Sequence, residues 1–263
     1  MEQFVVMWLL EEIGHKMDLR QYGGTRGNSV SHYLIELVNF ILHCQDRPEP
    51  TAVLACLVDF SKAFNRQDHS ILIIKLSDMG VPAWLLNLVI AFLTNRRMIV
   101  RYKGEESDPK MLPGGGPQGT LLGLFLFLVL INDVGFEGQT NKVGELATRR
   151  KNFKQLNEIH LKFVDDLTLA EAIDLKSQLL DVPFKERPHP DNFHARTGHT
   201  LRPEDSKVFS QLENTKQYAA TNGMKLNPKK TKLMLFNLPK SWTSCHLFLL
   251  MIKRYHWLRR PPF

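Results

Sequence analysis

The sequence predicts an α+β fold with a predominantly antiparallel sheet. Segments with the 3.6-residue period of amphipathic helices alternate with short apolar runs rich in β-branched residues. Two of these short runs, between residues 159 and 170, flank a tight acidic turn, which is typical of a hairpin. A length of 263 residues with 43% hydrophobic side chains is enough for one or two domains with a buried core.

Six segments are expected to be helical. Ser29 has the side chain of a helix cap, Gly80 and Gly223 end helices, and Pro82 suits a first helical turn. The segment from Pro117 is apolar on all sides, so we expect its helix to be buried. The expected helices are an amphipathic one within residues 1–12, then Ser29 to about Cys44, His69 to Met79, Pro82 through Phe92, Pro117 to Asn132, and Ser206 to Asn222.

Strands are expected in four places, and at two of them acidic residues lie at a strand end. The apolar, β-branched run 52–58 predicts a buried strand with Asp59 at its C-terminal end. Residues 159–170 predict a strand, a turn that holds Asp165 and Asp166, and a second strand. The other expected elements are a hairpin at about 98–107 and a strand at 231–236.

The net charge of +7 is distributed unevenly. Nine of the 34 Lys and Arg residues, and no Asp or Glu, lie between Lys225 and Phe263, which leaves 25 basic against 27 acidic residues elsewhere. Most of the chain is therefore not basic, and its charge alone does not indicate a nucleic-acid partner. Polar composition predicts loops at 135–158 and 181–205 and a basic tail at 239–263.

Cysteine usage and hydropathy argue against secretion and membrane insertion. Three scattered cysteines without a C-x-x-C pair fit a reducing compartment, without a disulfide partner or a structural zinc site. The longest apolar run, Leu121–Ile131, has 11 residues, whereas about 20 are needed to span a bilayer. We expect an intracellular protein, in the cytoplasm or nucleus.

The acidic residues at the strand ends form the first candidate site. Carboxylates from Asp59 and from Asp165 and Asp166, if they converge, would offer the hard oxygen ligands that Mg²⁺ prefers. Two such ions can clamp the attacking and leaving oxygens of a phosphoryl transfer. The alternative is structural: the acidic pair forms a hairpin turn and Asp59 caps a helix. Spacing alone leaves both interpretations open.

A glycine-rich turn before the buried helix is the second candidate site. Glycines allow the backbone of Gly116-Pro117-Gln118-Gly119 to approach a nucleotide or a template strand closely. A proline that starts the following helix would place a helix N-terminus, which favours phosphate, beside this turn. The alternative is a plain loop-to-helix joint.

Four motifs in order resemble motifs A to D of reverse transcriptases, with the character of non-LTR, LINE-type retrotransposon enzymes. Ile131-Asn132-Asp133 after the second motif and Gln21–Ser29 upstream, which resembles the fingers motif, extend the similarity to residues 20–238. Thr25 stands where that fingers motif usually has arginine, and Arg26 follows it. The four motifs are Asp59–Asn65, Gly114–Gly123, Phe163–Asp166 and Leu226–Lys232.

The resemblance implies a right-hand polymerase fold with fingers and palm subdomains and an antiparallel palm sheet. Residues 1–50 would form part of the fingers. Residues 51–238 would form the palm, with a fingers insertion at about 67–112. The tail, residues 239–263, shows no thumb pattern, so we expect the thumb to be largely absent.

The resemblance also implies roles at the acidic site. Asp59, Asp165 and Asp166 would be catalytic carboxylates that hold two Mg²⁺ ions, with Mn²⁺ as a possible substitute. The backbone carbonyl of Phe60 would be a further metal ligand. Lys230 would protonate the pyrophosphate leaving group as a general acid.

Roles in nucleotide binding follow from the same resemblance. Phe64 would be a steric gate against the 2′-hydroxyl of a ribonucleotide, although a phenylalanine at such a corner is also ordinary core. Further nucleotide contacts are implied for Gln118, Gly119 and Arg26, and contacts with template or primer for Gly116 and Pro117.

The implied function is RNA-directed DNA polymerisation. An enzyme of this kind adds dNTPs to the 3′-hydroxyl of a DNA primer on an RNA template, and it would come from a retrotransposon. The alternative is a catalytically inactive, truncated remnant that binds nucleic acid. An RNA-dependent RNA polymerase shares the palm chemistry, but a gate at Phe64 argues against it.

Overall fold

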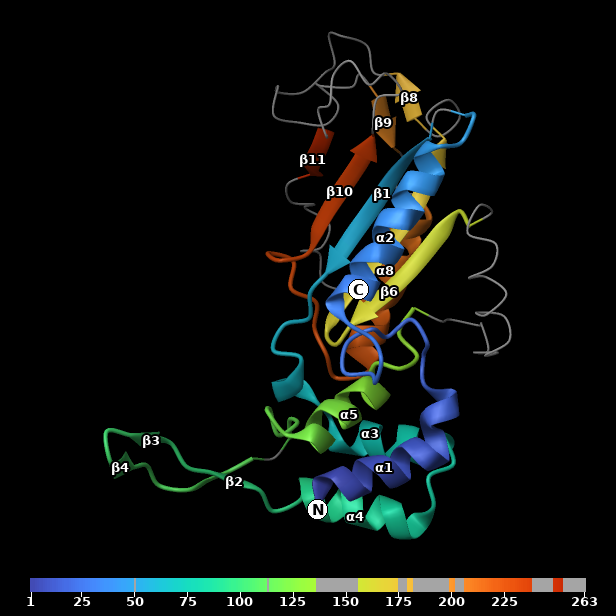
Figure 1. Cartoon of the computed structure of the whole chain (residues 1–263). Helices are drawn as coiled ribbons and strands as arrows, with labels where there is room; N and C mark the ends of the chain where they lie inside the picture. The colour runs from blue at the N-terminus through green and yellow to red at the C-terminus, as the bar shows by residue number, and fades with distance from the viewer. Residues whose placement is uncertain are drawn as a thin grey trace. The chain divides into compact units, whose positions relative to one another are not determined.

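The computed structural model describes residues 1–49, 51–112, 114–135, 156–174 and 206–237, and also the backbone of three further short strands. Its chain divides into two compact units, which are described separately (Figure 1). The helical unit comprises Met1–Leu19, Ser61–Val143 and Tyr218–Lys225; the sheet unit comprises Arg20–Phe60, Gly144–Gln217 and Leu226–Phe263.

The sheet unit contains a five-stranded antiparallel sheet, which confirms the expected sheet type (Figure 1). Its strand order is β11-β10-β1-β7-β6, so β1 lies in the middle. The strands are β1 (Thr51–Val58), β6 (Glu158–Phe163), β7 (Asp166–Asp174), β10 (Lys232–Asn237) and β11 (Phe248–Ile252).

Both faces of the central strand are covered. Helix α2 (Val30–Gln45) begins at the predicted cap Ser29, whose side chain accepts a hydrogen bond from His32, and packs in one cluster with Val53 and Ala55. Leu54 points to the opposite face and is also buried. Its partner across the ladder, Glu171, accepts hydrogen bonds at the start of helix α8 (Lys207–Thr221), which therefore begins on that opposite face.

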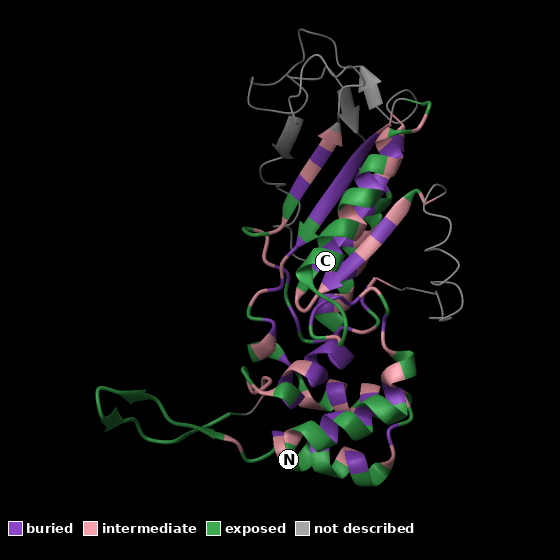
Figure 2. Cartoon of the chain, in the orientation of Figure 1, coloured by how far each residue is buried: buried purple, intermediate pink, exposed green. Residues whose placement is uncertain are grey.

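The helical unit is built around the apolar helix α5 (Leu121–Leu130), of which eight of ten residues are buried (Figure 2). This burial confirms the expectation from its composition. Asn132, just after α5, accepts from the backbone N–H of Asp18 (2.7 Å) and donates to the carbonyl of Lys16 (3.0 Å). The other elements are α1 (Glu2–Ile13), η1 (Gly14–Lys16), η2 (Phe64–Arg66), α3 (His69–Asp78) and α4 (Ala83–Leu93).

The expected hairpin after α4 is confirmed, and its strands are exposed (Figure 2). The register shifts by one residue along the ribbon, so Asp108 and Pro109 form a bulge opposite the single residue Ile99. Lys103 and Gly104 form the turn with positive φ angles. The strands are β2 (Arg97–Met98), β3 (Arg101–Tyr102), β4 (Glu105–Glu106) and β5 (Lys110–Met111).

One predicted boundary is wrong. Helix α5 begins at Leu121 and not at Pro117, because Gly119 has a φ of +84° and the side chain of Thr120 caps the helix by accepting from the backbone N–H of Gly123. Pro117 therefore lies in the loop before the helix, and the glycine-rich turn does not itself form the helix N-terminus.

The predicted polar regions lie mostly outside the described residues. Within 181–205 and just before it, β8 (Leu179–Asp181) pairs antiparallel with β9 (His199–Leu201), where we expected only loop. Strand β11 likewise falls within the predicted tail. Of these predicted regions, residues 136–155, 182–198, 202–205, 239–247 and 253–263 lie outside the described part of the chain. No described helix combines the length and apolar character needed to cross a bilayer.

Candidate active site

Asp59 and the acidic turn lie at the same end of two paired strands. Strand β1 ends at Val58, which pairs with Leu167 near the start of β7. One further step along this register places Asp59 opposite Asp166. The two strands are antiparallel, so the residue after one strand meets the first residue of the other. Segments far apart in the sequence therefore meet at this end of the sheet.

The three carboxylates at this end influence one another electrostatically. The pKa of Asp166 is raised, first by partial burial and then by the negative charges of Asp165 and Asp59, while Lys230 opposes this shift. The Asp59 side chain is 23% exposed, Asp165 is half-buried and Asp166 is exposed. A cluster of like charges that solvent can reach favours a bound cation.

The segment that carries Lys230 is attached directly to Asp59. The backbone N–H of Asn227 donates to the Asp59 carbonyl (2.7 Å), and the Asp59 N–H donates to the hydroxyl of Thr231 (3.4 Å). Lys230 Nζ lies 3.7 Å from Asp59 Oδ1, and its side chain is 71% exposed. Its ammonium group is thus held near the carboxylates but remains free to move. Lys229, its neighbour, is also exposed.

The carboxylates fit magnesium by their chemistry, but they do not form a complete cage. In the described part of the chain, no three or more His, Cys, Asp or Glu side chains are grouped closely enough to hold a metal ion. Mg²⁺ commonly uses one or two carboxylates and completes its shell with water and substrate phosphates. The donor set of Asp59, Asp165 and Asp166 matches that chemistry.

The acidic turn also depends on a residue that sequence reasoning missed. The buried side chain of Gln21 hydrogen-bonds both the N–H (2.9 Å) and the carbonyl (3.3 Å) of Val164, which immediately precedes Asp165. Gln21 was noticed only as part of the upstream fingers motif, 143 residues away. Arg26, seven residues before the buried Tyr33, is an exposed residue of the same segment.

The glycine-rich turn belongs to the helical unit, where it lies against Phe64. The N–H of Gly116 donates to the Phe64 carbonyl (2.7 Å), and the Phe64 ring stacks on Phe127 of α5 with centroids 4.5 Å apart. The structure thus brings Phe64 and Gly116 together. Gln118 and Gly119 are exposed at the turn, where a ligand can reach them.

Two further residues, also missed from the sequence, hold this turn. The N–H of Gly115 donates to the carbonyl of Gln67 (2.9 Å), and His69 Nε2 lies 2.9 Å from the carbonyl of Gly115. The Gln67 side chain is 1% exposed, yet neither atom of its amide has a hydrogen-bond partner among the described residues. Residues 64–69 therefore form the support of the glycine-rich turn.

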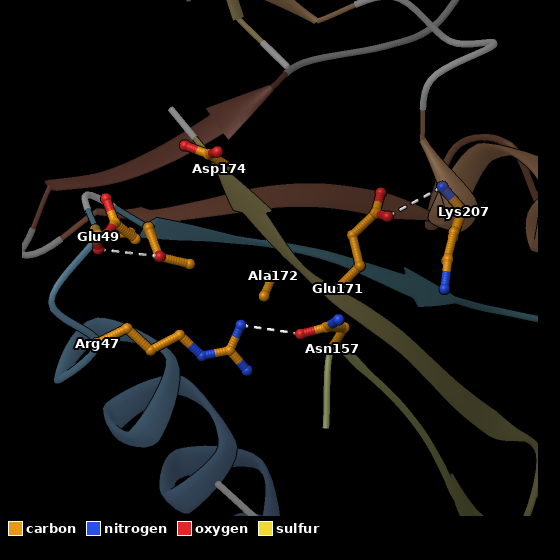
Figure 3. A pocket seen from close by; sticks show the side chains of 8 residues that line it. Arg47, Glu49, Asn157, Glu171, Ala172, Asp174 and Lys207 are labelled. Carbon is orange, nitrogen blue, oxygen red and sulfur yellow. Dashed lines mark hydrogen bonds between the residues drawn. The ribbon is translucent and has the colours of Figure 1, made fainter. Parts of the chain in front are cut away.

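A pocket of about 350 Å³ in the sheet unit is a different feature (Figure 3). It lies at the opposite end of the β1–β7 pair from Asp59, beside Thr51 and Asp174. Arg47 donates there to the side chain of Asn157 (2.9 Å), and Glu171 accepts from the N–H of Lys207 (2.9 Å). These polar groups are occupied in holding α2 and α8 to the sheet, so the pocket is not a candidate active site.

Known proteins share sequence with this chain over part of their length. It is 32% identical over 114 residues to a probable RNA-directed DNA polymerase from transposon BS of Drosophila melanogaster, covering 43% of this chain and 12% of that protein. It is 28% identical over 180 residues to the RNA-directed DNA polymerase from mobile element jockey of Drosophila funebris, covering 67% of this chain and 18% of that protein. This chain is a relative of mobile-element RNA-directed DNA polymerases.

The relationship to LINE-type reverse transcriptases that the four motifs predict is thereby confirmed. The chain spans less than a fifth of the length of these polymerase relatives. No protein-family model matches it.

The fold of this polymerase relative is also similar to that of telomerase. Telomerase from Candida albicans, solved in complex with a fragment of telomeric RNA, gives a TM-score of 0.54 at 12% identity, covering 92% of this chain and 36% of that one. Telomerase from Candida tropicalis, in a similar complex, gives 0.52, covering 88% and 33%. At this identity the likeness concerns the fold alone, which is a reverse-transcriptase-like polymerase fold of helices and an antiparallel sheet.

Proposed function

We propose that the chain is the catalytic core of a retrotransposon reverse transcriptase, in which residues 51–238 form the palm and residues 1–50 and about 67–112 contribute to the fingers. The observation that carries this proposal is the convergence of Asp59 with the acidic turn in a relative of RNA-directed DNA polymerases. The substrates would be a DNA primer, an RNA template and dNTPs.

In the proposed reaction the primer 3′-hydroxyl attacks the α-phosphate of a dNTP. A bond forms between the 3′-oxygen and that phosphorus, the bond to the β-phosphate oxygen breaks, and pyrophosphate leaves. Two divalent cations, Mg²⁺ or Mn²⁺, would supply charge stabilisation at the attacking and leaving oxygens. The residues that would hold them are Asp59, Asp165, Asp166 and the carbonyl of Phe60.

Lys230 would donate a proton to the departing pyrophosphate. Its position 3.7 Å from Asp59 Oδ1 and its exposure support this role, because the ammonium group can move from the carboxylate to an incoming triphosphate. The hydroxyl proton of the primer would pass to solvent or to pyrophosphate.

The glycine-rich turn would contact the nascent base pair. Gln118 and Gly119 would touch the incoming nucleotide, and Gly116 and Pro117 would line the path of template and primer. Arg26 would contribute positive charge toward the triphosphate. The exposure of Gln118, Gly119 and Arg26 is compatible with these contacts.

Phe64 would exclude ribonucleotides. Its ring stacks on Phe127, and its backbone carbonyl accepts from the N–H of Gly116. A steric gate requires a ring that is supported in this way. Replacing Phe64 by Ala should raise the incorporation of rTTP relative to dTTP by about tenfold or more, since the change opens space for the 2′-hydroxyl. Phe4→Ala, at an exposed position on α1, is the matched control.

Primer extension tests the proposed function. The protein should extend oligo(dT) on poly(rA) with dTTP and Mg²⁺, and Asp165→Ala should lower the rate by about a thousandfold or more. Asp78→Ala, which removes an exposed carboxylate at the end of α3, should leave the rate unchanged. Full activity of the Asp165→Ala variant would contradict the site assignment.

A catalytically inactive remnant is the second candidate. The excess of acidic over basic residues before Lys225 favours it, because holding a primer–template duplex during synthesis depends on positive charge. The remnant would bind RNA with a steep salt dependence and would not extend a primer under any metal condition. The same extension assay, with a binding titration at several salt concentrations, separates the two.

A further inference from the structure

The acidic turn contains a residue in an unusual backbone conformation. Val164 and Asp165 form the two-residue connection between β6 and β7, which is closed by the pairing of Phe163 with Asp166. Val164 has a φ of +55°. Turns of this kind normally place glycine at such a position, and a β-branched side chain rarely adopts it. Something outside the turn must therefore hold Val164.

The side chain of Gln21 binds both backbone polar groups of Val164. Gln21 Oε1 accepts from the N–H groups of Val164 (2.9 Å) and Gly23 (3.0 Å), and Nε2 donates to the Val164 carbonyl (3.3 Å). A single amide thus satisfies a donor and an acceptor of the same residue, as a partner strand would. Gln21 is 3% exposed, so water does not compete for these bonds.

The backbone of Gln21 is itself anchored to the strand that leads into the turn. Gln21 forms a parallel bridge with Lys162 on β6. The N–H of Tyr22 donates to the Lys162 carbonyl (2.8 Å), and the N–H of Lys162 donates to the carbonyl of Arg20 (2.9 Å). The side-chain amide is therefore presented to Val164 from a fixed backbone.

Gly23 allows the same segment to approach the turn. A Cβ atom at Gly23 would lie 2.5 Å from the backbone nitrogen of Val164 and 2.9 Å from the carbonyl carbon of Phe163. Both of these are backbone atoms, which cannot rotate away as the end of a side chain can. The segment 20–23 and the acidic turn thus fit together closely.

We infer that Gln21 is a positioning residue for catalysis, which fixes the backbone of Val164 and thereby the direction of the carboxylates of Asp165 and Asp166. This inference rests on the proposed function. Groups that orient metal ligands without touching the metal commonly change metal affinity about 10- to 100-fold when they are removed. Loss of the Gln21 amide should therefore weaken metal binding more than nucleotide binding.

The test compares three single variants of the full chain. Gln21→Met removes every hydrogen bond of the amide at similar volume, whereas Gln21→Glu keeps an acceptor for the two N–H groups and loses the donor. Gln45→Met is the matched control, because Gln45 donates to the Phe236 carbonyl (2.8 Å) from α2, at a site remote from the turn along the sheet. Circular dichroism establishes that each variant is folded.

Two measurements are made on each variant. Hydrogen exchange of the Val164 amide should become about tenfold faster or more in Gln21→Met, and change less in Gln21→Glu and Gln45→Met. The Mg²⁺ concentration for half-maximal primer extension should rise about tenfold or more in Gln21→Met, with little change in KM for dTTP. Mn²⁺ should restore part of the rate.

Unchanged exchange at Val164 in Gln21→Met would overturn the inference, as would a Mg²⁺ requirement equal to that of Gln45→Met. If Gln21→Met does not fold, Gln21→Glu, which loses the bond to the Val164 carbonyl, is compared with Gln45→Met, and its Mg²⁺ requirement should still be the higher of the two. If the wild-type chain extends no primer, the proposed function fails by itself. The exchange result, together with Mn²⁺ binding followed by electron paramagnetic resonance, then decides whether Gln21 fixes the turn.

Discussion

The acidic turn of the sheet unit and the glycine-rich turn of the helical unit are held in their conformations by different contacts. Both present candidate site residues on irregular backbone, and both lie against a buried glutamine. Gln21 makes three hydrogen bonds, two of them to Val164 in the acidic turn. The side-chain amide of Gln67, beside the glycine-rich turn, makes none within the described structure.

This difference shows which hydrogen bonds hold each turn in place. The acidic turn is held by a satisfied side-chain amide, and disturbing it leaves backbone groups without partners. The glycine-rich turn is held by backbone bonds from Gly115 and Gly116 and by His69. The backbone carbonyl of Gln67 accepts from Gly115, but its side-chain amide makes no hydrogen bond with the described residues. Substitutions at corresponding places in the two turns should therefore have unequal effects.

The largest effect on stability is expected for Gly23→Ala. A Cβ there overlaps the backbone of Val164 and Phe163, so the turn or the segment 20–23 must move. We expect the free energy of unfolding to fall by about 2–4 kcal/mol, measured by urea denaturation. Gly14→Ala is the control, since its Cβ would meet Leu10 at an ordinary 3.7 Å. Equal stability of both variants would show that the two segments do not pack closely.

The two buried glutamines should respond in opposite ways to the same substitution. Gln21→Met leaves the N–H and carbonyl of Val164 without their partner and should lower the free energy of unfolding by about 2 kcal/mol. Gln67→Met removes a buried amide that has no partner among the described residues, and should be neutral or stabilising by up to about 1 kcal/mol. Thermal and urea unfolding of the pair measure the contrast. A larger loss for Gln67→Met would reverse the comparison.

His160, on the strand that leads into the acidic turn, should make the stability of the protein depend on pH. The pKa of His160 on β6 is lowered to about 4, mainly by burial and then by Arg20 and Lys162, while Glu158 opposes the shift. Its ring nitrogens are shielded from solvent. The unfolded chain, in which histidine titrates near 6.5, therefore binds the proton first as the pH falls.

Above about pH 6.5 His160 is neutral in both the folded and the unfolded chain, so it does not lower the free energy of unfolding. As the pH falls toward 4, protonation of His160 in the unfolded chain lowers that free energy progressively. At pH 5 the loss should be roughly 1–2 kcal/mol relative to pH 7. His160→Leu should remove this part of the pH dependence in urea unfolding at the two pH values. If the free energy of unfolding of that variant still depends on pH as in the wild type, groups other than His160 cause the dependence.

A small effect is expected at Gly116. A Cβ there overlaps the side-chain amide of Gln67, which can rotate because no hydrogen bond with the described residues holds it. Gly116→Ala should therefore cost about 1 kcal/mol, less than Gly23→Ala, and Gln67→Ala in the same chain should relieve most of that cost. Additive effects of the two substitutions would indicate that Gln67 does not rotate into the space of Gly116.

Local patterns were sufficient for most of the fold. Elements whose ends depend on residues within a few positions were predicted to within one or two residues from hydrophobic periodicity and from the residues that cap or end them. Examples are the helix capped by Ser29, the strand before Asp59 and the helix end at Gly80. The start of α5 was missed because the left-handed conformation of Gly119 and the cap at Thr120 outweigh the preference of Pro117 for a first helical turn.

The candidate site was predictable only in part. Ordered motifs and strand ends led to Asp59 and the acidic turn, because antiparallel strands bring such ends together. The roles of Gln21 and Gln67 could not be read from local sequence. Gln21 bonds a residue 143 positions away, and the buried amide of Gln67 is defined by packing. Lys230 is singled out by the resemblance and not by spacing, and its position beside Asp59 comes from the structure alone.

The central claim is that Asp59 and the acidic turn act as one catalytic site. The most direct measurement is the primer-extension rate of Asp59→Ala, Asp165→Ala and the double variant, each with Mg²⁺ at saturation. Groups that act as a unit are not additive. Each single variant should therefore lose about a thousandfold or more, and the double variant should be no slower than the singles. Single variants that retain most of the rate, or losses that multiply in the double variant, would contradict the account.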